Sequence, residues 1–221
     1  MKKAFLFDMD GVLADTETEW DRLGYDDLLK NHFGPELYAK VTIKGGTSIK
    51  GIFDQFVEAG WAGDYESFYR LNVSIATQIY GQIQLTPGID ALTHSLLKSG
   101  FVVGVVSSSP LEWIEMLVSR LADRDRLAIV VSVNNHPTLK PKPAPDPYLY
   151  AIRELGVEPG RTLVLEDSQT GVTSARSAGA QVICFTQFNH GYAWQSKPTN
   201  AHYYAASMEE VEQVVAKINL E

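Results

Sequence analysis

The sequence predicts an α/β protein built on an open, doubly wound parallel sheet, and three observations support this fold class. First, five short apolar runs are continuous rather than alternating, which is typical of strands buried on both faces. Second, amphipathic segments separate most of these runs, so strand and helix alternate along the chain. Third, about ninety residues lie between the first two runs. That interval is far longer than one crossover helix requires and indicates an inserted unit.

The strands and helices of the sheet-forming part follow from this alternation. The predicted strands are 4–7, 102–106, 128–133, 162–165 and 181–185. The predicted helices between and after them are 89–98, 111–121, 147–155, 171–178 and 209–218. Pro87-Gly88 forms a turn before the first of these helices, and Gly100, Gly156 and Gly179 lie where helix C-caps are expected.

The long interval after the first strand is predicted to be helical. Helices are expected at 18–33, 48–59 and 65–82. We therefore expect a helical cap domain at residues 16–84 and an α/β core at residues 1–15 and 85–221. The insertion point agrees with the rule that ligands bind beyond the carboxyl ends of parallel strands.

Composition limits the classes of partner. The chain has 19 Lys and Arg residues against 27 Asp and Glu residues, which gives a formal net charge of −8. Nucleic acid and anionic membranes reward a basic face, so neither is expected as the main partner. A small anionic substrate stays compatible, because a few fixed cations and a metal ion set the field inside a site.

Cysteine usage and hydropathy indicate a soluble protein of the cytoplasm. Cys184 is the one cysteine, so no intramolecular disulfide can form, and its apolar neighbours predict a buried thiol. No apolar run approaches the roughly 20 residues that cross a bilayer. The first residues do not have the layout of a signal peptide.

Two carboxylates, Asp8 and Asp10, follow the first predicted strand and precede Gly11. In an extended segment, residues i and i+2 lie on the same side. Two carboxylates that close repel each other unless a divalent cation or a proton intervenes. Phosphoryl transfer needs an oxygen nucleophile and a proton donor, which such a pair can supply. Taken alone, the pair fits a solvated or calcium-type loop equally well.

A serine cluster follows the second strand. Ser107, Ser108 and Ser109 precede Pro110, at the expected start of a helix. Hydroxyls and free N–H groups at a helix start form an anion site. Taken alone, the cluster is better explained as a serine N-cap.

Two lysines lie in a proline-rich segment after the third strand. Pro141, Pro143 and Pro145 restrict the backbone around Lys140 and Lys142. A lysine fixed in this way can offset the charge of a phosphate. A stiff surface linker is the alternative, and it would be preferred if the segment stood alone.

Acidic residues follow the fourth strand directly. Glu166 and Asp167 come after an apolar run, where carboxylates are hard to bury without a partner. Their hard oxygens suit Mg²⁺. The alternative is a helix N-cap formed by Asp167 or Ser168. Each of the four clusters ends one parallel strand, so all four are expected at the same edge of the sheet.

The four clusters, in this order, resemble the motifs of the haloacid dehalogenase superfamily, in its subgroup with a helical cap after the first strand. The resemblance spans nearly the whole chain. The runs FDMDGVLADTE at 7–17, KPAPDP at 142–147 and LEDSQTG at 165–171 are similar to the branch that contains beta-phosphoglucomutase and small sugar-phosphate phosphatases. The resemblance implies a Rossmann-like core with an inserted α-helical cap.

The resemblance also implies a role for each motif residue. Asp8 would attack phosphorus and form an aspartyl-phosphate, while Asp10 would protonate the leaving oxygen and then deprotonate the hydrolytic water. The transferring phosphoryl group would be held by Ser107, with Ser108 beside it, and by Lys142, which aligns better than Lys140.

Mg²⁺ is the implied cofactor. Its ligands would be the Asp8 side chain, the Asp10 backbone carbonyl and Asp167, with Glu166 binding directly or through water. These roles agree with phosphoryl-transfer catalysis, which depends mainly on positioning and charge neutralisation.

The resemblance predicts hydrolysis of a small phosphate monoester. Asp10 disfavours the dehalogenases and the phosphonate-cleaving members, which do not have an aspartate at this position. A phosphosugar mutase is the alternative, but Trp20 stands where the mutase has a histidine and Pro110 where it has a lysine. A metabolite-binding protein without activity is a further alternative. Four intact motif residues argue against it: Asp8, Asp10, Lys142 and Asp167.

Residues of the inserted unit are expected to set specificity. The segment 42–50 resembles the loop that closes over the active site, and Lys44, Gly45 and Lys50 are its candidate substrate contacts. Two solvated lysines beside a helix start are an equal alternative. Other candidates have ordinary packing or surface contact as alternatives: Trp20, Trp61 and Tyr65 in the cap, and His190, Tyr192 and Trp194 in the 188–197 loop. A monomer or a homodimer fits the sequence.

Overall fold

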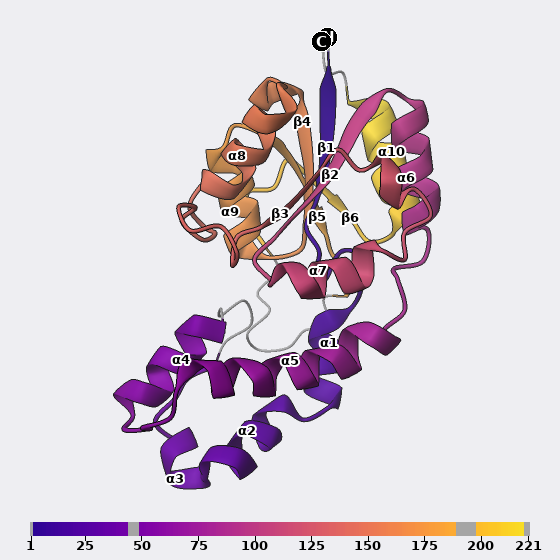
Figure 1. Cartoon of the computed structure of the whole chain (residues 1–221). Helices are drawn as coiled ribbons and strands as arrows, with labels where there is room; N and C mark the ends of the chain where they lie inside the picture. Colours follow the sequence, from indigo (N-terminus) through magenta and orange to yellow (C-terminus); the bar gives the residue numbers. More distant parts are fainter. Residues whose placement is uncertain (1, 44–48, 189–197, 219–221) are drawn as a thin grey trace. The chain divides into compact units, whose positions relative to one another are not determined.

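The computed structural model describes residues 2–43, 49–188 and 198–218. The chain divides into two compact units, Met1–Asp15 with Gln84–Glu221 and Thr16–Ile83. We call the first the core unit and the second the helical unit. Figure 1 shows the sheet in the core unit and the helices of both units.

The core unit contains one six-stranded parallel sheet in the order β3-β2-β1-β4-β5-β6. Its strands are β1 (Lys3–Phe7), β2 (Phe101–Ser107), β3 (Ile129–Ser132), β4 (Thr162–Glu166), β5 (Gln181–Phe185) and β6 (Tyr203–Ala205). The predicted α/β fold class is confirmed. Strand β6 was not predicted, because it is only three residues long and Tyr204 at its centre is exposed.

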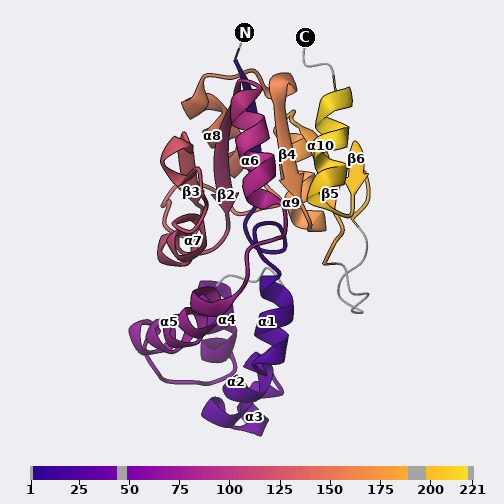
Figure 2. The same cartoon turned by 90° about the vertical axis from the view of Figure 1, so that its right-hand side faces the viewer.

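Helices cover both faces of the sheet, as a doubly wound fold requires. They are α6 (Ile89–Lys98), α7 (Leu111–Val118), α8 (Asp146–Leu155), α9 (Gln169–Ser177) and α10 (Met208–Lys217). Figures 1 and 2 place α8 and α9 on one face and α6 and α10 on the other. Short 3₁₀ turns at Arg124–Arg126 and Pro159–Arg161 lie in the connections.

The central strand β1 explains why the site residues converge. Residues 4–7 are almost completely buried, so apolar contacts on both faces determine the register of the strand. Phe7 pairs with Val105 of β2 and with Leu165 of β4. The three strands therefore end nearly in step, and the polar residues after them lie at the same edge of the sheet.

The helical unit contains α1 (Thr16–Arg22), α2 (Tyr25–Phe33), α3 (Pro35–Tyr38), α4 (Ile49–Glu58) and α5 (Tyr65–Gln82). The single helix predicted at 18–33 is wrong, since it is two helices. Gly24 separates them with a left-handed backbone (φ 64°), which no continuous α-helix accommodates. The predicted helix at 65–82 is confirmed, whereas the four-residue α3 was not predicted.

Aromatic side chains form the interior of the helical unit. Phe33 contacts Phe56, Trp61 and Phe68, with ring centroids 4.2–5.8 Å apart. Trp20 packs against Tyr25, at a centroid distance of 4.8 Å. Aromatic pairs at these distances add to the stability that apolar burial supplies. Tyr65 similarly contacts Phe53, so Trp20, Trp61 and Tyr65 all take part in packing.

Two further expectations have an outcome in the described residues. Cys184 is a fully buried cysteine on β5, as predicted. Over the described ranges, the structure contains no helix with the length and apolar character needed to span a membrane.

Candidate active site

A compact loop after β1 carries the first two carboxylates. The amide of Asp8 still donates to Leu165 O at 2.9 Å, and the chain then turns, with Leu13 N donating to Met9 O at 2.8 Å. Met9 is fully buried. Asp8 and Asp10 flank it in sequence and therefore lie on the opposite side of the segment. Asp8 is buried, whereas Asp10 is half-buried.

Thr86, in the segment where the chain re-enters the core unit, forms hydrogen bonds that hold this loop in place. Thr86 is 2% exposed, and its Oγ1 donates to Val12 O at 2.6 Å. Its amide donates to Leu13 O at 2.8 Å. The loop is therefore held by main-chain and side-chain bonds together, which gives Asp8 and Asp10 a fixed backbone.

Lys142 is the cation at the centre of the site. Its side chain is 6% exposed, and Nζ lies 2.6 Å from Asp8 Oδ1 and 2.6 Å from Glu166 Oε1. A third bond runs to Val106 O at 3.2 Å. All three ammonium protons have acceptors in this arrangement. Lys140, by contrast, is exposed.

Glu166 is fully buried and accepts bonds from two hydroxyls as well as from Lys142. Tyr148 Oη, from α8, donates to Glu166 Oε1 at 2.7 Å, and Ser168 Oγ donates to Oε2 at 3.1 Å. The Tyr148 ring also lies 4.9 Å from Lys142 Nζ. Sequence reasoning missed Tyr148. An aromatic residue in the first turn of a buried helix is predicted to be a core residue. No sequence pattern predicts the hydrogen-bond partner of its hydroxyl.

Ser168 also serves as the N-cap of α9, accepting from the Gly171 amide at 3.0 Å. The N-cap considered for this segment is therefore present, and it adjoins the acidic residues instead of replacing them. The Ser168 amide also donates to Glu166 Oε2, at 3.4 Å.

The serine cluster after β2 lies beside Asp10. Ser107 is buried and Ser108 is half-buried. Ser109 Oγ donates to Asp10 Oδ2 at 2.7 Å, and the Ser109 amide donates to Ser107 Oγ at 3.0 Å. Ser109 was quoted as part of the motif but was not predicted as a site residue, because the side-chain direction in a loop is not readable from sequence.

Two glycines leave room for the carboxylates after β4. A Cβ atom on Gly11, whose φ is +73°, would lie 2.0 Å from Asp167 Oδ2. A Cβ atom on Gly171 would lie 1.9 Å from Glu166 Oε1. Both distances are far below contact, so any larger residue would displace a carboxylate. The close approach of Gly11 to Asp167 was not predicted from the sequence.

The acidic cluster has the donor set of a metal site. Carboxylate oxygens of Asp8, Glu166 and Asp167 lie within 4.8 Å of one another. Hard oxygens at this spacing fit a small divalent cation. These residues also exceed the positive charge that Lys142 supplies, and a bound cation would balance the difference.

The electrostatics of Asp8 reflect that excess of negative charge. Burial, followed by repulsion from Glu166, raises the pKa of Asp8 to about 8, although Lys142 acts in the opposite direction. Burial alone would lower the pKa of Lys142, but Asp8 and Glu166 outweigh burial and leave it above its ordinary value. Burial and Glu166 also raise the pKa of Tyr148, so its hydroxyl stays a donor.

Of the three candidate substrate contacts in the helical unit, Lys50 lies within the described residues. Lys50 is exposed on α4 and pairs with Asp54 one turn further on. This pairing is what a solvated helix face predicts. Lys44 and Gly45 lie outside the described residues, and so do His190, Tyr192 and Trp194.

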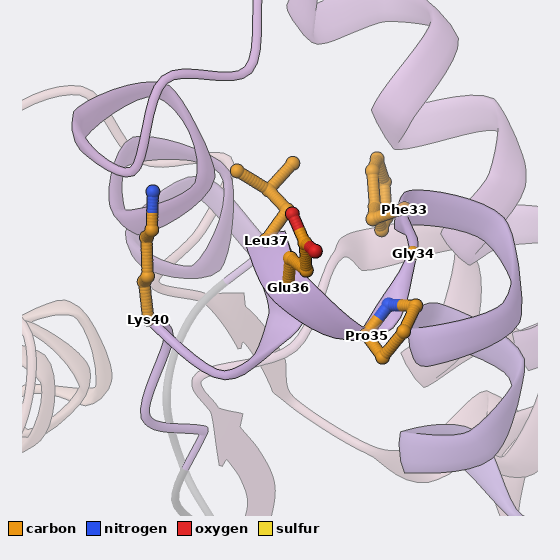
Figure 3. Close-up of a pocket in the computed structure, with 6 residues that line it drawn as sticks. All are labelled: Phe33, Gly34, Pro35, Glu36, Leu37 and Lys40. Carbon is orange, nitrogen blue, oxygen red and sulfur yellow. The ribbon is translucent and has the colours of Figure 1, made fainter.

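A pocket between α2 and α3 is separate from these candidates. It is lined by Phe33, Gly34, Pro35, Glu36, Leu37 and Lys40. Figure 3 shows the side chain of Lys40 on one side of the pocket, Glu36 and Leu37 in the middle, and Phe33 and Pro35 on the other side. None of the predicted site residues takes part in it.

The parallel sheet places carboxylates and a buried lysine together at the ends of its strands. This arrangement is that of an α/β enzyme. The family model described as "Haloacid dehalogenase-like hydrolase" matches residues 5–185. The chain belongs to this family, and the predicted resemblance and hydrolase class are confirmed.

Individual relatives agree with this assignment. Hexitol phosphatase B of Escherichia coli (strain K12) is 29% identical over 81% of this chain and 82% of its own. A CBBY-like protein of Arabidopsis thaliana is 28% identical over 83% of this chain. This chain spans 63% of that relative's length. The crystal structure of CbbY from Rhodobacter sphaeroides in complex with phosphate superimposes with a TM-score of 0.68 at 26% identity, covering 96% of both chains.

The contact between Gly171 and Glu166 leads to a first prediction. Gly171→Ala should displace the Glu166 carboxylate and disturb Lys142 with it. We expect a loss of about 1–3 kcal/mol in unfolding free energy and about a hundredfold loss of catalytic activity, since misplacement by about 1 Å can cost this much. Thermal unfolding and steady-state kinetics measure both.

Gly160→Ala is the matched control, because a Cβ atom there would meet nothing within 4 Å. It should keep both properties. Wild-type activity in Gly171→Ala would show that catalysis does not depend on the position of the Glu166 carboxylate.

Proposed function

We propose that this protein is a Mg²⁺-dependent phosphatase that hydrolyses a small phosphorylated metabolite, a sugar phosphate by preference, through an aspartyl-phosphate on Asp8. The observation that carries the proposal is the buried contact of Asp8 with Lys142, beside the acidic cluster at the carboxyl ends of β1 and β4. The phosphatase name of the hexitol phosphatase relative and the phosphate bound to CbbY support the choice of substrate class.

The first chemical step would use Asp8 as nucleophile. Its carboxylate oxygen attacks phosphorus, the ester P–O bond breaks, and Asp10 gives its proton to the leaving oxygen. Lys142 holds the carboxylate of Asp8 in place from the side of Oδ1. The ammonium and the Ser107 hydroxyl, with Ser108 beside it, are the groups of this chain that would hold the phosphoryl oxygens.

The second step would hydrolyse the aspartyl-phosphate. Asp10, now ionised, takes a proton from water as that water attacks phosphorus, and the bond to Asp8 breaks. Inorganic phosphate leaves, and both aspartates return to their starting state. Asp8, Asp167 and the Asp10 carbonyl, with Glu166 nearby, would hold Mg²⁺. The ion supplies neutralisation of the charge on the phosphoryl oxygens.

The helical unit has the proposed role of a cap that excludes water and selects the substrate. Lys44, Gly45 and Lys50 remain its proposed contacts. A mutase is the alternative activity. Trp20 packs against Tyr25 within the helical unit, so this position offers no positive charge for a second phosphate. Hydrolysis is therefore preferred.

The nucleophile can be tested directly. Asp8→Asn should lower Mg²⁺-dependent hydrolysis of an aryl phosphate by at least about a thousandfold, because the amide cannot attack phosphorus. Phosphate release measures the rate. Asp125→Asn, at an exposed position of the core unit, is the matched control and should retain full activity. Full activity in Asp8→Asn would exclude the proposed nucleophile.

Metal binding should depend on pH, because the raised pKa of Asp8 makes a proton compete with the ion. The folded pKa of about 8 lies above the ordinary value of 3.8. The metal-free protein therefore gains stability from protonated Asp8 at low pH and loses it as pH rises through about 8. Mg²⁺ needs the ionised carboxylate. Its stabilising effect should therefore be larger near pH 8.5 than near pH 6.

Thermal unfolding with Mg²⁺ or with EDTA at the two pH values measures this difference. In Asp8→Asn the pH dependence of the Mg²⁺ effect should shrink. An equal shift of the wild-type Tm at both pH values would contradict the prediction.

Phosphatase and mutase activities are separated by their products. Incubation with a hexose 1-phosphate and Mg²⁺ should release inorganic phosphate without accumulation of the hexose 6-phosphate. Phosphate analysis and NMR of the sugar follow both products. Rapid formation of the 6-isomer with little phosphate release would favour the mutase.

A further inference from the structure

We infer that Ser109 is a positioning residue for proton transfer, because its hydroxyl fixes the carboxylate of Asp10. The inference rests on the proposed function, in which Asp10 is the acid and then the base. Asp10 follows β1, and Ser109 follows β2, 99 positions later in the chain. Their side chains meet in a hydrogen bond of 2.7 Å from Ser109 Oγ to Asp10 Oδ2. Bonds from a hydroxyl to a carboxylate are charge-assisted and strong.

Ser109 is itself held on both sides of its Cα atom. Its amide donates to Ser107 Oγ at 3.0 Å, and its carbonyl accepts from Ser132 Oγ at 2.7 Å. Ser132 ends β3, where it pairs in register with Ser107 of β2. The ends of two neighbouring strands thus hold the backbone of Ser109 in place, and its hydroxyl donates to Asp10 from a fixed position.

Asn135 completes this support. Its amide donates to Ser132 Oγ at 3.2 Å, and its Oδ1 accepts from the Leu111 amide at 2.8 Å. The bond to Leu111 holds the start of α7, the helix that follows the serine cluster. The loop that presents Ser109 is therefore tied at its beginning, its middle and its end.

The bond decides which oxygen of Asp10 carries the proton. Because Ser109 donates to Oδ2, that oxygen is an acceptor, and a proton on the carboxyl group is directed to Oδ1. In the proposed reaction, Oδ1 would then deliver the proton to the leaving oxygen and take one from water. Asp10 is half-buried, and the bond from Ser109 restricts the rotamers of its side chain. The alternative roles for Ser109 are direct contact with the phosphoryl group and purely structural support of the loop.

Leaving groups of different basicity distinguish these roles. An aryl phosphate leaves as a stable phenolate and needs little protonation, whereas an alkyl phosphate such as a hexose 6-phosphate needs the acid. We expect Ser109→Ala to lower kcat/KM for the alkyl ester about tenfold or more, and for the aryl ester less than about threefold. A phosphate contact or a structural role would lower both values by the same factor.

Matched variants complete the experiment. Ser109→Thr keeps the hydroxyl and should restore most of the alkyl phosphatase activity. Ser109→Cys, which keeps the volume with a weaker donor, should show a smaller selective loss and serves if the alanine variant is unstable. Ser95→Ala removes another serine–carboxylate bond, the one of 2.6 Å to Glu212, and should change neither value.

Asp10→Asn separates failure of the inference from failure of the proposed function. A selective alkyl loss in Asp10→Asn, together with equal losses in Ser109→Ala, would overturn the role of Ser109 and leave the proposed function standing. Unselective behaviour of Asp10→Asn would remove the acid role itself. Selective losses in both variants, with rescue by threonine, are the expected result.

Discussion

The buried ammonium of Lys142, held between Asp8 and Glu166, is the interaction on which the rest of the site depends. Burying an ion costs several kcal/mol unless its partners match closely. Here each group has more than one bond, since Tyr148 and Ser168 also donate to Glu166. Removing Lys142 would leave two buried carboxylates without their cation. The position of Asp8 is therefore tied to β4, to α8 and to the segment that precedes α8.

The convergence of these groups could be predicted from sequence, because it follows from strand register. Continuous apolar runs predicted which strands are buried on both faces, and parallel strands buried in this way end at one edge. Asp8, Lys142 and Glu166 were expected there for this reason, and the structure places them within bonding distance. Their catalytic roles came from the resemblance and stay proposals.

The parts that were missed depend on details that periodicity does not encode. Tyr148 has the burial of any core aromatic, and its hydroxyl finds Glu166 only because α8 packs at a particular rotation. Ser109 differs from Ser108 by one position in a loop, where side-chain direction follows local φ and ψ values. The separation of α1 from α2 depends on one residue, Gly24, which has a left-handed backbone. Each of these outcomes is decided by tertiary packing or by one dihedral angle, whereas the hydrophobic pattern is averaged over many residues.

Asp8 and Asp10 illustrate how two identical side chains acquire different environments within one short loop. Asp8 is buried against an ammonium and a second carboxylate, an environment in which an oxygen nucleophile is held by charge. Asp10 is half-buried and accepts a hydrogen bond from the hydroxyl of Ser109, which is a neutral donor. Separate environments for two carboxylates are what acid–base and nucleophilic roles require. The difference follows from their partners: Asp8 contacts Lys142, in the segment after β3, whereas Asp10 contacts Ser109, in the loop after β2.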